Sequence, residues 1–101
     1  MNSAEKLGTM EIPNGKVVIE FYSPRCKSCQ DVQKILDEVL EEFEDVRLIR
    51  VNVFENREFA RSFDVIALPV IIALKDGIEV GRLKGAKSRS EIVEFLREVF
   101  G

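Results

Sequence analysis

The sequence of 101 residues contains no histidine, no tryptophan and only two cysteines. Without histidine, a Ser–His or Cys–His catalytic pair is impossible. A closed zinc site usually takes four cysteine or histidine ligands, so one chain alone lacks the ligands for it, although two chains could share a metal through their cysteine pairs. The net charge of −3 argues against nucleic acid as the main partner.

Long apolar runs are also missing. The apolar stretches are far shorter than the roughly 20 residues that a membrane-spanning helix needs, so no membrane contact is expected. Residues 1–13 lack a basic region followed by an apolar one, so we predict no secretory signal and a cytoplasmic location. The length suits one core, and we expect a single domain over residues 1–101, with residues 1–12 as an N-terminal arm or extra edge strand.

Both cysteines lie where a strand pattern meets a helix pattern. The segment 17–22 is apolar and β-branched, as in a buried strand, and is followed by PRCKSC at 24–29. Apolar residues then recur over 32–43 with the spacing of one helix face. Backbone N–H groups and the helix dipole at such a junction stabilise a thiolate, which indicates thiol–disulfide chemistry.

The remaining patterns predict the element order β-α-β-α-β-β-α. Strands are expected at Lys16–Tyr22, 45–53, 70–74 and Ile78–Lys84, and the second of them is expected to be buried. The first helix should run from the cysteines to near Phe43, and the second over 57–63 with Asn56 as its cap. The last helix should follow a capping box formed by Ser88 and Glu91. Strands separated by helices favour parallel pairs, whereas Asp76-Gly77 predicts an antiparallel hairpin. The fold class is therefore α/β, with a mixed sheet of four to five strands and helices on both faces.

Four features in this order resemble the thioredoxin family. They are the Cys-x-x-Cys at the strand–helix junction, Pro69 at the start of the third strand, the Asp-Gly hairpin, and Gly85-Ala86 before the last helix. The resemblance covers residues 14–101. It implies the thioredoxin fold and a thiol–disulfide oxidoreductase that reduces protein disulfides, with the redox-active Cys26–Cys29 pair as its only redox group, and no other cofactor or metal.

By this resemblance Cys26 is the nucleophile and Cys29 the resolving cysteine. A spacing of three residues brings their Cα atoms to roughly 5–6 Å, within the range that a disulfide needs. Arg25 and Lys27 add positive charge that favours the Cys26 thiolate, and both are candidate substrate contacts. The alternative is a static disulfide or two unreactive cysteines.

Glu20 interrupts the apolar strand 17–22. The family has an acidic residue at the matching position, which implies that Glu20 exchanges a proton with Cys29. Burial there raises the pKa of a carboxyl group. Alternatively, Glu20 points to solvent from a half-exposed strand. Arg50 matches a basic residue near that acid and either tunes it by charge or is an ordinary surface arginine.

The resemblance further implies a cis Leu68–Pro69 peptide bond. The backbone of Leu68 then lies beside Cys26 and binds an extended substrate by strand addition. The alternative is a proline that simply opens a strand. A shallow apolar groove is expected from Ile66, Ala67, Leu68, Gly85 and Ala86, of which Ala67, Leu68 and Gly85, with Pro69, are candidate substrate-binding residues.

The active-site dipeptide departs from the family's usual Trp-Cys-Gly-Pro-Cys. The cation of Lys27 and the hydroxyl of Ser28 favour the reduced thiolate form, so we expect a reduction potential less reducing than the roughly −270 mV of thioredoxin, toward the glutaredoxin range. Expected partners are disulfide-containing client proteins and an electron donor resembling thioredoxin reductase, with a monomeric chain. Alternatives are an oxidant or isomerase, a non-catalytic binding module, and a dimer holding a metal or iron–sulfur cluster.

Overall fold

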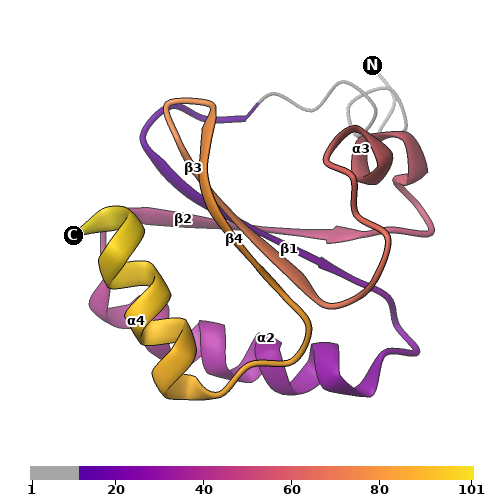
Figure 1. Ribbon diagram of the computed structural model, residues 1–101, viewed down its shortest axis with the longest axis horizontal. Coiled ribbons are helices and arrows are strands. Elements are labelled where there is room, and N and C mark those ends of the chain that lie inside the picture. The colour runs from indigo at the N-terminus through magenta and orange to yellow at the C-terminus, as the bar shows by residue number, and fades with distance from the viewer. Residues whose placement is uncertain (1–11) are drawn as a thin grey trace.

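The computed structural model describes residues 12–101 and places four strands in one sheet, in the order β2-β1-β3-β4 (Figure 1). The elements are β1 Lys16–Tyr22, α2 Lys27–Val39, the 3₁₀ turn η1 Leu40–Glu42, β2 Val46–Asn52, α3 Arg57–Ser62, β3 Val70–Lys75, β4 Ile78–Lys84 and α4 Arg89–Phe100. β1 pairs in parallel with β2 and antiparallel with β3, and β3 and β4 form an antiparallel hairpin. The predicted order and mixed sheet are confirmed, whereas the predicted arm or fifth strand, apart from Ile12, lies outside the described residues.

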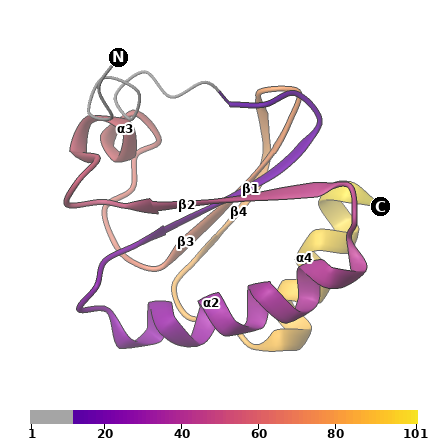
Figure 2. The same ribbon diagram turned by 180° about the vertical axis from the view of Figure 1, so that it is seen from behind.

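The sheet separates two apolar clusters because strand side chains alternate between its faces. Val18 packs toward α2 and α4, while Val17, Ile19 and Phe21 pack toward α3. Figure 2 shows α2 and α4 on one side of the sheet and α3 on the other, as predicted. Burying each of these large side chains contributes about 1.5–3 kcal/mol.

The helix ends follow the local sequence signals. α2 tightens into η1, and the N–H of Phe43 closes this last turn on the Leu40 carbonyl at 3.0 Å, near the predicted end. α4 begins at the predicted capping box, where Ser88 Oγ accepts from the Glu91 N–H and Glu91 Oε1 accepts from the Ser88 N–H. Within residues 12–101, no helix has both the length and the apolarity to span a membrane.

Two expectations are corrected. The strand β2 is buried only at Val51, because it lies at the edge of the four described strands and not between two of them. Asn56 occupies the N-cap position of α3, but its side chain accepts no hydrogen bond from the helix. Its Nδ2 instead donates to the carbonyl of Asn52 at 2.9 Å, which ties the residue back to the preceding turn.

We predict that Gly81→Ala destabilises the fold. A Cβ atom at Gly81 would lie 2.9 Å from Phe95 Cε1 and 2.9 Å from Val99 Cγ1, so these two side chains of α4 or the helix itself must move. The free energy of unfolding, measured by urea denaturation, should fall by about 1–3 kcal/mol. Ile78→Thr on the same strand, where the side chain is 69% exposed, should change it by less than about 0.5 kcal/mol. Equal effects of the two substitutions would contradict this packing.

Candidate active site

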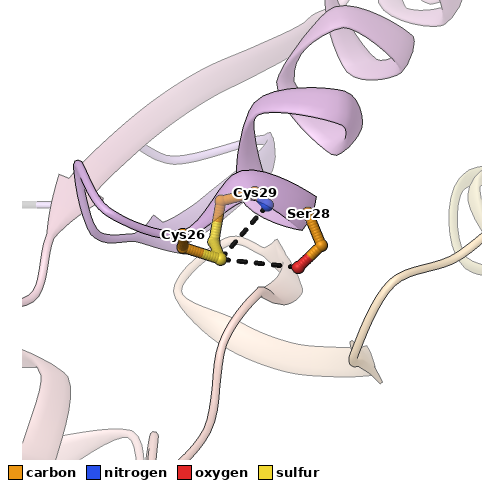
Figure 3. The surroundings of a disulfide bond; sticks show 3 residues. All are labelled: Cys26, Ser28 and Cys29. Atoms are coloured by element: carbon orange, nitrogen blue, oxygen red, sulfur yellow. Dashed lines mark hydrogen bonds between the residues drawn. A yellow bond between two sulfur atoms is a disulfide. The ribbon is translucent and has the colours of Figure 1, made fainter.

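The two cysteines form a disulfide at the start of α2 (Figure 3). Cys26 is the N-cap residue, with extended backbone at φ −89° and ψ 105°, and its N–H donates to the Ser23 carbonyl at 3.2 Å. The Cα atoms of Cys26 and Cys29 are 5.2 Å apart, as the spacing predicted. Cys26 is partly exposed, whereas Cys29 is 0% exposed under the first turn of the helix. An outside disulfide therefore meets Cys26 first.

The sulfur of Cys26 is surrounded by groups that favour negative charge. The backbone N–H of Cys29 donates to Cys26 Sγ at 3.2 Å, and Ser28 Oγ lies 3.5 Å from the same sulfur (Figure 3). The first turn of α2 contains no acidic residue, and the flanking Arg25 and Lys27 are exposed. On reduction, these donors and the helix N-terminus stabilise a thiolate at Cys26.

Glu20 is fully buried, with 0% of its surface exposed. It lies opposite Ile71, a member of the cluster under α2 and α4, so its side chain is on the α2 face of the sheet. Burial raises the pKa of Glu20, and this effect outweighs the opposing hydrogen bond and charge of Arg50. The expectation of a buried acid is confirmed, and the alternative of a solvent-facing Glu20 is wrong.

Arg50 connects this buried acid to α2. Its Nε donates to Glu20 Oε1 at 2.8 Å, while its Nη2 donates to the Gln33 carbonyl and to Asp37 Oδ1, both at 3.0 Å. Arg50 therefore tunes Glu20 and is more than a surface arginine. The other carboxylate oxygen, Glu20 Oε2, is buried without a hydrogen-bond partner among the described residues.

Asp37 was not among the predicted site residues, although it contributes to this group. Its charge raises the pKa of Glu20, as a smaller effect after the burial of Glu20 itself. The available signal was its position one helical turn after Gln33, which places both residues on the side of α2 that Arg50 reaches.

The peptide bond between Leu68 and Pro69 is cis, as the resemblance implied. Val70, the next residue, pairs with Phe21 near the end of β1 and with Lys84 at the end of β4. The Gly85 N–H donates to the Pro69 carbonyl at 2.8 Å. The cis-proline and Gly85 thus lie at the same end of the strands as the cysteine loop, which follows the last residue of β1. Leu68 is half-buried and Ala67 exposed beside them.

A disulfide at a strand–helix junction, with a cis-proline at the same sheet edge, defines a thiol–disulfide oxidoreductase. A family model described as Thioredoxin matches residues 5–98. Thioredoxin of Mycobacterium bovis is 30% identical over 111 residues, covering 98% of this chain and 96% of that protein. Thioredoxin of Bacillus subtilis is 29% identical over 89 residues, covering 87% and 86%.

Among solved structures, the oxidised form of mitochondrial thioredoxin 3 from Saccharomyces cerevisiae superposes with a TM-score of 0.81 at 26% identity. The match covers 93% of this chain and 88% of the yeast one. The chain belongs to the thioredoxin family, and both the predicted thioredoxin fold and the thiol–disulfide oxidoreductase activity are confirmed.

We predict that Glu20→Gln removes a pH-dependent loss of stability. Because the pKa of Glu20 is raised on folding, the folded chain binds more protons than the unfolded chain above about pH 4.5, and stability falls as the pH rises through the folded-state pKa. The free energy of unfolding of the variant, minus that of the wild type, should therefore increase across this window. Parallel pH curves in chemical denaturation would show that Glu20 titrates normally.

We predict that Ser28→Ala makes the protein more reducing. The variant loses a hydroxyl near Cys26 Sγ that stabilises the thiolate, so the reduced form is less favoured. A loss of about 0.5–1 kcal/mol corresponds to a potential about 10–20 mV more negative in a glutathione redox titration. Alkylation of Cys26 by iodoacetamide at neutral pH should also slow. Ser28→Thr keeps the hydroxyl and should match the wild type; identical potentials in all three proteins would exclude this role.

Proposed function

We propose that this oxidoreductase reduces disulfides in client proteins, with Cys26 as nucleophile and Cys29 as resolving cysteine. The asymmetry of the pair carries the proposal. Cys26 is partly exposed and its sulfur has two hydrogen-bond donors, whereas Cys29 is fully buried. Only the first sulfur is available to a large substrate.

The reaction then proceeds by two exchanges. The Cys26 thiolate attacks one sulfur of the client disulfide, the client S–S bond breaks, and the other client sulfur leaves as a thiolate. Cys29, as a thiolate, attacks Cys26 Sγ in the mixed disulfide and releases the second client sulfur. The client gains two electrons, its two thiolates take up the two protons that Cys26 and Cys29 released to become thiolates, through solvent, and the protein ends as the Cys26–Cys29 disulfide seen in Figure 3.

We propose Glu20 as the group that takes the proton from Cys29. The carboxyl group is buried on the α2 face, its pKa is raised, and Oε2 has no partner among the described residues. A raised pKa suits a group that must both accept and release a proton near neutral pH. Arg50 limits the increase in the pKa of Glu20 and holds the carboxyl group in place by donating to Oε1.

Client backbone is proposed to pair with Leu68 by strand addition, next to Pro69, with Ala67 and Gly85 beside it. The supporting observation is that this segment adjoins the start of β3 at the same edge as the cysteine loop. Arg25 and Lys27, both exposed, are the proposed charged contacts.

We further propose that the chain is a monomeric single domain with no cofactor or metal besides the Cys26–Cys29 pair. It would carry two electrons from a donor resembling thioredoxin reductase to its clients, and so serve electron transport and cell redox homeostasis. A cytoplasmic location suits a protein used in its dithiol form, because thiols are kept reduced there. A potential near that of disulfide isomerases would instead favour the oxidant or isomerase alternative.

Insulin reduction with dithiothreitol as donor tests the proposal. Wild type should accelerate precipitation of the insulin chains, and Cys26→Ser should lose the acceleration by about 100-fold or more, because the remaining thiol, Cys29, is fully buried. Cys29→Ser should still attack and accumulate a mixed disulfide with the client, visible by mass spectrometry. A Cys26→Ser protein that retained the activity would refute the assignment.

A further inference from the structure

An apolar hollow lies between the end of β2 and α3, outside the redox pair. Its volume is about 410 Å³, and its lining includes Val53, Phe54, Arg57, Arg61, Asp64 and Ile66. Phe54 is 59% exposed and Ile66 is 97% exposed. Large apolar side chains gathered at an exposed hollow with a polar rim are typical of a binding surface.

The rim of this hollow is cationic. Arg57 and Arg61 lie one turn apart on α3, and neither forms an ion pair with another residue of the described range 12–101. The guanidinium of Arg57 lies over the Phe54 ring, 5.9 Å from its centroid. Two cations beside apolar side chains suit a partner that carries a carboxylate next to an apolar side chain.

Asp64 is the one acidic residue in the lining. The pKa of Arg82 is raised chiefly by its hydrogen bond with Glu79, and the charge of Asp64 adds to this effect. The carboxylate of Asp64 is therefore partly balanced by Arg82, outside the hollow. Arg57 and Arg61 form no ion pair among the described residues, so the lining of the hollow holds two unpaired cations and one carboxylate on a chain of net charge −3.

The hollow is continuous with the proposed client-binding edge. The backbone runs from Ile66 through Ala67 to Leu68 and the cis-proline, so Ile66 lies within about 8 Å of Leu68. On the other side, the Val53 N–H donates to the carbonyl of Tyr22, the last residue of β1 before the cysteine loop. An extended segment paired with Leu68 reaches the hollow within about three residues.

We propose that the hollow binds an apolar side chain of the client segment, and that Arg57 and Arg61 pair with a carboxylate next to it. Preferred clients then carry an apolar–acidic pair a few residues from the reacting cysteine. The inference rests on the proposed function, because it specifies which disulfides the redox pair reduces fastest.

Homodimeric peptide disulfides test this preference. Each peptide has one cysteine and the same two-residue pair on both sides of it, three residues away. The pair is Phe-Glu in the first peptide, Phe-Lys in the second and Ser-Glu in the third. Pre-reduced protein supplies both electrons in a single turnover, followed by quenched flow. At subsaturating peptide, Phe-Glu should react about 5-fold faster than Phe-Lys, and 0.5 M NaCl should reduce the difference. The Phe-Glu peptide should also react faster than the Ser-Glu peptide, and Phe54→Ala should reduce this difference in rate.

Reversing the charges of Arg57 and Arg61 tests whether these two residues determine the peptide preference. Arg57→Glu combined with Arg61→Glu should slow the Phe-Glu peptide and accelerate the Phe-Lys peptide. Arg47→Glu combined with Lys75→Glu changes the net charge by the same amount. Both positions are exposed and lie at the other end of the strands, beside the start of β1, so this variant should keep the wild-type preference. If this control pair inverts the preference too, overall charge selects the client and the proposal is overturned.

A small neutral disulfide, bis(2-hydroxyethyl) disulfide, separates the two proposals. It is too small to span from the cysteines to the hollow, so wild type and both double variants should reduce it equally. If wild type reduces the small disulfide and also reduces the three peptides at rates equal to one another, the docking site is overturned while the reductase function stands. If wild type reduces none of the four, the proposed function itself fails.

Discussion

The central strand β1 is the constraint on which the rest of the structure depends. It is paired with β2 on one side and β3 on the other, and its apolar side chains are buried on both faces. The end of such a strand has little freedom to move, so the loop after Tyr22 leaves the sheet at a fixed point. The same pairing brings Pro69 and Gly85 to that point, since the first residue of β3 is opposite Phe21. The redox site is therefore a consequence of sheet register.

A charged residue inside this strand works against stability. Glu20 is fully buried and one of its oxygens has no partner among the described residues, so removing its charge from water costs more than Arg50 returns. An apolar residue of similar size would pack there without that cost. The protein tolerates it because the two apolar clusters on either face of β1 provide the compensating stability. The buried carboxyl group therefore does not serve folding, which is consistent with the proton transfer proposed for it.

Local signals made much of the fold predictable. The apolar, β-branched run of β1, the Asp-Gly hairpin and the Ser88 capping box each depend on residues close in sequence, and the structure confirms them. The edge position of β2 could not be predicted because strand order is set by contacts distant in sequence. The side chain of Asn56 had two competing hydrogen-bond choices, and the sequence does not rank them. The cis bond at Pro69 followed from the family resemblance alone, since an X–Pro bond taken by itself favours the trans isomer.

The site divides into a part set by backbone and a part set by side chains. The donor at Cys29 N, the cis-proline carbonyl and the helix N-terminus are main-chain groups, so they are supplied by the backbone and not by a particular side chain. Phe54, Arg57, Arg61 and Ile66 are exposed side chains that the core does not require. Substitution there leaves both apolar clusters and the sulfur geometry intact. A fold organised in this way keeps one chemistry while its client preference changes through residues beside α3, where changes have little effect on stability.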